Sequence, residues 1–235
     1  MKAKIRTPFF ELGVKNYIYG DDVLALAKAA DLAARKYDVD VLFISPYTEI
    51  RRVREQTEHL IVLAPYMDTL RPGRGMADVL PEALKAAGAQ GVVINHCEKP
   101  MTLTAIRQTI ERARELDLIS FVCADTLAEA QAVAHFSPDI INPEPTDLIG
   151  SSNERDMDYV FESIRLIKEI NPNILVEQAA GISSGQQVYE LISAGAEATG
   201  AASGIVTAED PLKMVDEMVR MVMQAREDRK MRKIV

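Results

Sequence analysis

Short apolar stretches alternate with amphipathic stretches along the whole chain. The apolar stretches are rich in β-branched residues, which is typical of parallel strands buried on both faces. In the amphipathic stretches, such as 23–30, 106–113 and 188–192, apolar residues recur at helical spacing. A last helix is predicted over about 211–229. The predicted strands are 9–12, 39–45, 60–64, 91–95, 119–123, 139–142, 174–176 and 199–202.

This alternation predicts an α/β fold, a single (β/α)8 TIM barrel that occupies residues 1–235 as one domain. The eight predicted strands, most of them followed by a helical stretch, match the count of that barrel. A doubly wound open sheet is the alternative architecture. Its glycine fingerprint after the first strand is missing, because Gly13 stands alone before Val14 and Lys15.

Composition narrows the range of partners. The chain has 48% apolar residues, enough for a sizeable core, and a formal net charge of −8. It has no basic stripe, so nucleic acid is not an expected partner. The longest apolar runs, such as 60–65, are too short to span a bilayer, and residues 1–6 lack the apolar core of a signal peptide. We therefore expect no membrane association and a cytoplasmic location.

Cys97 and Cys123 are the two cysteines of the chain. Their spacing resembles no zinc motif, so no metal is expected, and two reduced, partly buried thiols are more probable than a disulfide. Cys97 follows His96 directly. Because adjacent strand residues point to opposite faces, we do not expect the two side chains to form a nucleophilic pair.

Polar side chains follow the first, fourth and sixth predicted strands. Lys15 follows the first strand, His96 and Glu98 follow the fourth, and Glu144 follows the sixth. In a barrel of this kind, functional residues lie at the carboxyl ends of the strands. A histidine and a carboxylate on two strand ends can move a proton beside a carbonyl group.

Glu144 and His96 each have a second, purely structural interpretation. Pro143 and Pro145 stiffen the backbone around Glu144, which suits a base held in place, but a surface carboxylate in a proline-rich turn fits equally. A lone histidine is more often a core residue. His96, however, ends an apolar strand and precedes a predicted helix, whose N-terminus would favour the neutral imidazole.

Glu98 and Lys15 are also open to two interpretations. Glu98 with Lys99 can be a salt-bridged turn or part of the chemistry. Lys15 can be an exposed loop lysine, or a charge that neutralises an enolate or a phosphate.

Small residues follow the last two predicted strands, at 179–183 and 201–204. Barrels often hold a phosphate group there with backbone N–H groups, and small residues allow the close approach. Either segment alone is a weak signal, because Gly and Ser are common in any turn.

Taken together, four segments resemble the triosephosphate isomerase family, particularly its short archaeal form. Residues 94–99 are similar to the strand-four motif, and residues 144–150 to the segment that carries the base and begins the lid. Residues 180–183 and 202–204 resemble the two phosphate loops. The resemblance extends over about residues 9–211.

The resemblance implies an enzyme without cofactor or metal that acts on a small phosphorylated sugar, and a homodimer or homotetramer. Glu144 would be the general base, His96 the neutral electrophile, and Lys15 the residue that stabilises negative charge, a pairing established for the family. With Glu98, these residues form the candidate catalytic set. The candidate substrate- and phosphate-binding residues are Gly13, Ile149, Gly150, Gly181, Ser183, Ala202 and Ser203.

Three departures from the family pattern concern groups around the substrate. Gly13 stands where the family has Asn. The lid, at 151–158, lacks the usual Thr-Gly and is a few residues shorter than in the family. In the interface loop, Met76 stands where the family has a threonine. The expected function is an aldose–ketose isomerase acting through an enediol, first of all a triosephosphate isomerase. The alternatives are the same chemistry on a four-carbon ketose phosphate, or a divergent paralogue that binds a phosphosugar but is catalytically impaired.

Overall fold

Eight parallel strands form one sheet, in a computed structural model that describes residues 2–145 and 157–232. The order is β7-β6-β5-β4-β3-β2-β1-β8, and a parallel bridge between Glu177 and Ala198 joins the two ends, so the sheet closes into a barrel. The strands are β1 (Phe9–Gly13), β2 (Val41–Ile44), β3 (Leu60–Ala64), β4 (Gly91–Ile94), β5 (Ile119–Ala124), β6 (Ile140–Pro143), β7 (Leu175–Val176) and β8 (Ala198–Ala201).

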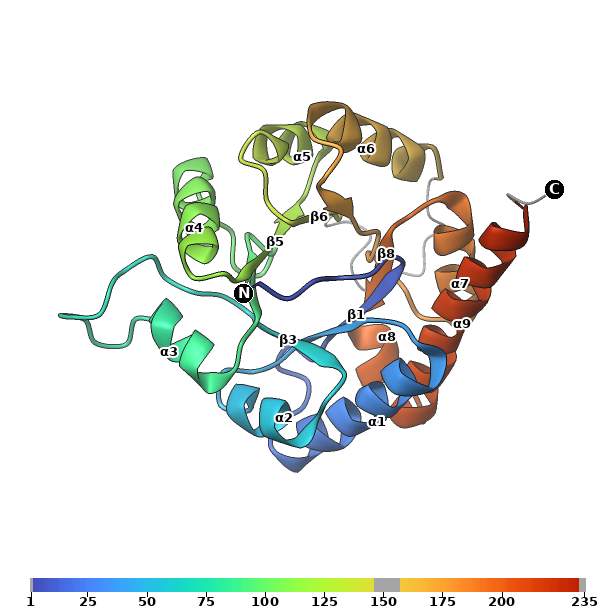
Figure 1. Cartoon of the computed structure of the whole chain (residues 1–235), viewed down its shortest axis with the longest axis horizontal. Coiled ribbons are helices and arrows are strands. Elements are labelled where there is room, and N and C mark those ends of the chain that lie inside the picture. Colours follow the sequence, from blue (N-terminus) through green and yellow to red (C-terminus); the bar gives the residue numbers. More distant parts are fainter. Residues whose placement is uncertain (1, 146–156, 233–235) are drawn as a thin grey trace.

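Helices surround the barrel as an outer ring (Figure 1). The predicted (β/α)8 barrel is therefore confirmed, and every predicted strand matches an observed one to within two residues at each end. The last helix extends three residues beyond its predicted end. The helices are α1 (Asp21–Tyr37), α2 (Ile50–Gln56), α3 (Pro81–Ala87), α4 (Leu103–Glu115), α5 (Leu127–Ala134), α6 (Met157–Ile170), α7 (Gly185–Ala194), α8 (Ser203–Val206) and α9 (Pro211–Arg232).

The strands divide their side chains between two apolar clusters. On β1, Phe10 and Leu12 pack in the larger cluster between strands and helices, whereas Phe9 packs inside the barrel with residues such as Phe121 and Ile140. Because side chains alternate along a strand, Glu11 and Gly13 follow Phe9 on the inner face. The inner face therefore leads from an apolar base toward polar groups at the carboxyl ends.

Side-chain caps set where several helices begin. Thr102, Thr126 and Ser184 each accept a hydrogen bond from a backbone N–H in the first turn of α4, α5 and α7 respectively. These caps fix the points at which the loops after β4, β5 and β7 end. The loops are thereby held over the same end of the barrel.

The N-terminal segment crosses the opposite end of the barrel, where the strands begin (Figure 1). Ala3 and Ile5 pack against the inner apolar cluster. Arg6 makes ion pairs with Asp38 and Asp40 after α1. This segment covers the base of the barrel and leaves the carboxyl ends of the strands open.

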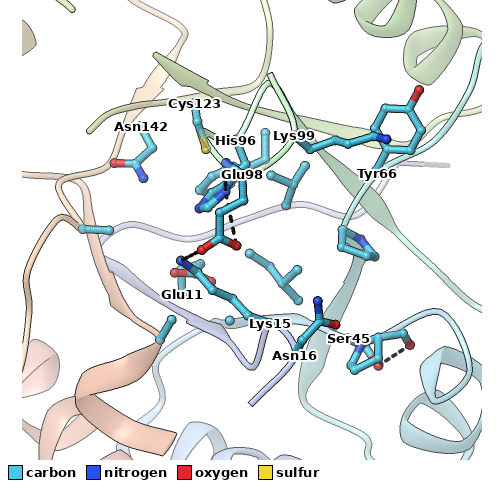
Figure 2. Close-up of a pocket in the computed structure, with 18 of the residues that line it drawn as sticks. Glu11, Lys15, Asn16, Ser45, Tyr66, His96, Glu98, Lys99, Cys123 and Asn142 are labelled. Carbon is cyan, nitrogen blue, oxygen red and sulfur yellow. Dashed lines mark hydrogen bonds and ion pairs between the residues drawn. The ribbon is translucent and has the colours of Figure 1, made fainter. Parts of the chain in front are cut away.

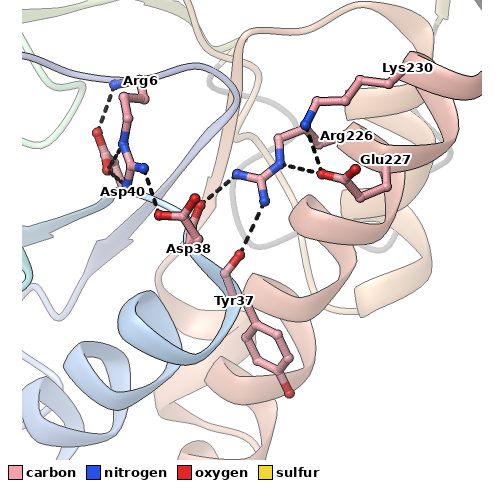
Figure 3. A network of polar contacts seen from close by, with 7 residues as sticks. All are labelled: Arg6, Tyr37, Asp38, Asp40, Arg226, Glu227 and Lys230. Carbon is pink, nitrogen blue, oxygen red and sulfur yellow. Dashed lines mark hydrogen bonds and ion pairs between the residues drawn. The ribbon is translucent and has the colours of Figure 1, made fainter.

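Helix α9 is tied to the end of α1 (Figure 3). Arg226 donates hydrogen bonds to the backbone carbonyls of Tyr37 and Asp38, and Glu227 pairs with Lys230 on the same helix. Cations at the C-terminal end of a helix satisfy its last carbonyl groups. The last helix is thus anchored beside the first. Within the described residues, no helix has the length and hydropathy needed to cross a membrane.

Candidate active site

A cavity of about 570 Å³ opens at the carboxyl ends of the strands (Figure 2). All four candidate catalytic residues line it, together with four of the candidate binding residues. In the part of the chain that the structure describes, no cluster of three His, Cys, Asp or Glu side chains has the arrangement of a metal site. The predicted residues that the fold brings together here are Gly13, Lys15, His96, Glu98, Glu144, Gly181, Ala202 and Ser203.

Lys15 lies just beyond β1 with a left-handed backbone, at φ 47°. Its Nζ is 3.0 Å from Oε1 of Glu98, in the loop after β4. Burial lowers the pKa of Lys15, but the hydrogen bond and charge of Glu98, with the charge of Glu144, outweigh it and raise the pKa overall. Lys15 is therefore a fixed positive charge inside the cavity.

His96 is held in one tautomer. The backbone N–H of Glu98 donates to His96 Nδ1 at 3.1 Å, so Nδ1 is an acceptor and the ring proton lies on Nε2. Burial, and then the positive charge of Lys15, lower the pKa of His96 below its ordinary value, against a smaller opposing effect of Glu98. The imidazole is therefore neutral near pH 7 and has one N–H to donate.

Asn95 braces the loop that carries His96. Its side-chain Nδ2 donates to the carbonyl of Cys123 on β5 at 3.0 Å, and its Oδ1 accepts from the N–H of Met101 at 2.8 Å. Asn95 has a positive φ of 60°, which Asn tolerates better than most residues. The turn after β4 is therefore tied at both of its ends.

Glu144 directly follows β6. Its backbone N–H donates to the carbonyl of Ala124 at 2.8 Å, and its carboxylate Oε2 accepts from Nδ2 of Asn142 at 3.1 Å. Pro143 and Pro145 on either side restrict the backbone. The carboxylate is therefore directed into the cavity from a rigid strand end, and the alternative of a surface carboxylate does not fit.

The expectation that Cys97 and His96 point apart was wrong. Cys97 Sγ lies 3.8 Å from His96 Nδ1. Strand β4 ends at Ile94, so both residues belong to a turn in which the alternation of strand side chains no longer applies. Burial and the charge of Glu144 raise the pKa of Cys97, which keeps the thiol protonated. Both cysteines are free thiols, as expected.

The loops after β7 and β8 pack directly on each other. A Cβ on Gly204 would lie 2.1 Å from the carbonyl oxygen of Ile182, so only glycine allows this approach. Gly181, at φ 67°, and Ala202 line the cavity from the two loops. The two loops therefore form adjoining parts of the cavity wall.

One candidate binding residue lies outside the cavity lining, and two are not among the described residues. Ser183 is exposed outside the cavity, and its N–H donates to Oε1 of Gln187 at 2.8 Å. Ile149 and Gly150 lie outside the described residues, as does most of the expected lid at 151–158.

Sequence reasoning overlooked two acidic residues inside the barrel. Glu11 on β1 is 7% exposed and lines the cavity, and Glu177 after β7 is fully buried. Asn142, which holds Glu144, was also missed. The available signal was a polar side chain inside an otherwise apolar strand, for Glu11 and Asn142, or directly after one, for Glu177.

Comparison with known proteins agrees with this arrangement. The family model described as triosephosphate isomerase matches residues 13–218. A triosephosphate isomerase of Methanobacterium bryantii is 34% identical over 221 residues, 92% of this chain and 97% of that protein. The triosephosphate isomerase of Methanothermus fervidus is 33% identical over 90% of this chain and 97% of that protein. That of Sulfolobus acidocaldarius is 30% identical over 96% of this chain and 99% of that protein. The chain belongs to the triosephosphate isomerase family.

Proposed function

We propose that this protein interconverts dihydroxyacetone phosphate and glyceraldehyde 3-phosphate through an enediol, with Glu144 as base and His96 as electrophile. The observation that carries this proposal is one cavity that holds the carboxylate of Glu144 and a neutral imidazole whose proton lies on Nε2. Both groups come from separate rigid strand ends. Family membership supports the same reaction.

The proposed reaction moves one proton between neighbouring carbons. The Glu144 carboxylate takes a proton from C1 of dihydroxyacetone phosphate, and the C–H electron pair becomes the C1–C2 double bond. The carbonyl electrons move onto O2, which accepts a hydrogen bond and then a proton from His96 Nε2. His96 regains a proton from the hydroxyl on C1, and Glu144 returns its proton to C2 to give the aldehyde.

Lys15 and Glu98 have supporting roles in this proposal. The positive charge of Lys15 stabilises the negative charge of the enediolate and of the phosphate. Glu98 holds Lys15 by the ion pair at 3.0 Å and holds His96 through its backbone N–H. The phosphate would lie against the backbone of Gly181, Ala202 and Ser203, where small residues allow close approach.

The first test is turnover of dihydroxyacetone phosphate by the purified protein. Glu144→Gln keeps the size of the side chain but removes the base, so kcat should fall by roughly 10³-fold or more, with little change in KM. The matched control is Glu58→Gln, which alters an exposed carboxylate away from the cavity and should leave kcat unchanged. A folded Glu144→Gln variant with wild-type kcat would contradict the assignment of the base.

We also propose a homo-oligomer that works in the cytoplasm, each subunit a single domain. The loop between β3 and α3 projects from the barrel (Figure 1). Near its tip, the side chain of Met76 is 93% exposed. An apolar side chain carried on a long projecting loop is suited to insertion into a neighbouring subunit. The family resemblance favours a dimer or a tetramer.

A further inference from the structure

Glu11 is a carboxyl group in the floor of the cavity that the proposed reaction does not use. It lies on β1, two residues before Gly13, with its side chain on the inner face of the barrel. It is more than nine-tenths buried. Among residues 2–145 and 157–232, no hydrogen bond to its carboxyl group is found. A buried carboxyl group at a cavity surface that has no hydrogen-bond partner among these residues is free to contact a molecule bound in the cavity.

Two glycines make room for this carboxyl group. A Cβ on Gly13 would lie 3.1 Å from Oε1 of Glu11, and a Cβ on Gly200 of the neighbouring strand β8 would lie 2.4 Å from Oε2. The carboxyl group therefore occupies space that side chains at 13 and 200 would otherwise fill. At position 13 a side chain would point into the same cavity, where the family pattern has an amide.

The charges around Glu11 favour its neutral form. Glu144 after β6 and Glu177 after β7 are both acidic, and Lys15 after β1 is the cation that acts on it. Cys123 on β5 is a buried neutral thiol. The adjacent strands β2 and β8 carry no titratable residue. Burial, followed by the charge of Glu144, raises the pKa of Glu11 to about 8.

We propose that Glu11 is a further catalytic residue of this site, a carboxylic acid that donates a hydrogen bond to the substrate oxygen on which negative charge develops. The proposal rests on the isomerase function proposed above. A carboxylate in this position would repel both Glu144 and an anionic substrate. A neutral carboxylic acid instead supplies a donor, as acids held neutral in apolar sites do in other isomerases. The carboxyl group of Glu11 would thus supply the donor that a side chain at position 13 supplies in the family pattern.

The test compares three variants in the rate of dihydroxyacetone phosphate isomerisation between pH 6 and 10. Glu11→Gln keeps an N–H donor that does not titrate, so it should retain most activity at pH 7 and lose the fall in kcat/KM that wild type shows above about pH 8. Glu11→Leu keeps the volume but has no donor. Its kcat should fall roughly 100-fold, with a smaller change in KM.

Glu177→Gln is the matched control. This variant replaces the other buried carboxyl group, which lies outside the cavity lining, by an amide. It should keep wild-type activity at pH 7 and should still show the fall in kcat/KM above about pH 8. The infrared C=O band of a protonated carboxylic acid gives a readout independent of turnover. At pH 7 the Glu11→Gln spectrum should lack one such band that wild type shows.

The proposal is overturned if Glu11→Gln shows the same fall at high pH as wild type, if Glu11→Leu retains wild-type kcat, or if no acid band is lost. If the wild-type protein has no isomerase activity, the proposed function itself is wrong. In that case, the affinity for 2-phosphoglycolate, whose carboxylate resembles the enediolate, tests whether Glu11 contacts the bound ligand. Glu11→Leu should weaken that binding roughly tenfold while Glu177→Gln leaves it unchanged, and equal affinities would reject the contact.

Discussion

At the residue scale, the two buried carboxyl groups of Glu11 and Glu177 make the stability of the barrel depend on pH. Burial raises the pKa of both, to about 8 for Glu11, and the charge of Glu11 adds to the rise at Glu177. In the unfolded chain, these groups lose their protons near pH 4.5. The folded protein therefore binds more protons than the unfolded chain above that pH, and stability falls as pH rises toward 8.

We predict that Glu11→Gln flattens this dependence. Between pH 5 and 8, the free energy of unfolding of wild type should fall by roughly 3 kcal/mol more than that of the variant, because Gln has no proton to lose. Glu177→Gln should change the slope in the same direction. Urea unfolding at the two pH values measures the difference. Parallel slopes for wild type and both variants would mean that the carboxyl groups are ionised in the fold.

At the element scale, Arg112 links α4 to α3 and to the loop after β3. Its side chain is 5% exposed, pairs with Glu82 on α3 and with Glu115 at 2.9 Å, and donates to the carbonyl of Leu70 at 3.5 Å. Arg107, five residues earlier on the same helix, makes a 2.6 Å pair with Glu111 but is 43% exposed. The two arginines differ mainly in burial.

Arg112→Leu should therefore destabilise the protein far more than Arg107→Leu. We expect losses in the free energy of unfolding of about 2 kcal/mol for Arg112, because buried polar groups lose their partners, and below about 0.5 kcal/mol for Arg107. Urea titration of both variants is the measurement. Removing Glu82 as well should recover part of the loss, since an uncompensated charge disappears. Equal losses at 107 and 112 would show that burial of Arg112 has no energetic effect.

At the scale of the whole molecule, the proposed homo-oligomer would assemble through the projecting loop after β3. Met76→Glu places a charge where the proposed interface needs an apolar side chain, so the protein should sediment as a monomer. Leu32→Glu on α1 is the control, because Leu32 is also exposed, at 54%, but lies on the helical ring. Sedimentation velocity distinguishes the two. A monomeric wild type would contradict the proposed oligomer.

Much of the fold and part of the site were predictable from local patterns. Buried parallel strands have a short apolar signature, and the chain order of strands and helices leaves few arrangements other than a barrel. Because all parallel strands end on the same side, Lys15, His96 and Glu144 were expected in one place, and they line one cavity. Ser183 was expected beside them but does not line the cavity, because neighbouring residues of a loop point in different directions.

The sequence by itself determined the alternation of strands and helices, and with it the end of the barrel at which polar residues gather. Only the tertiary structure decided which groups meet there. Glu11 and Glu177 come from β1 and from the end of β7, which neighbour each other only across β8 once the barrel has closed. Cys97 and His96 come together because their backbone has left the strand. Local sequence patterns determine which segments form strands and helices and where each strand ends. Contacts between segments far apart in the sequence, and the effect of one charged group on another, arise only when the barrel closes.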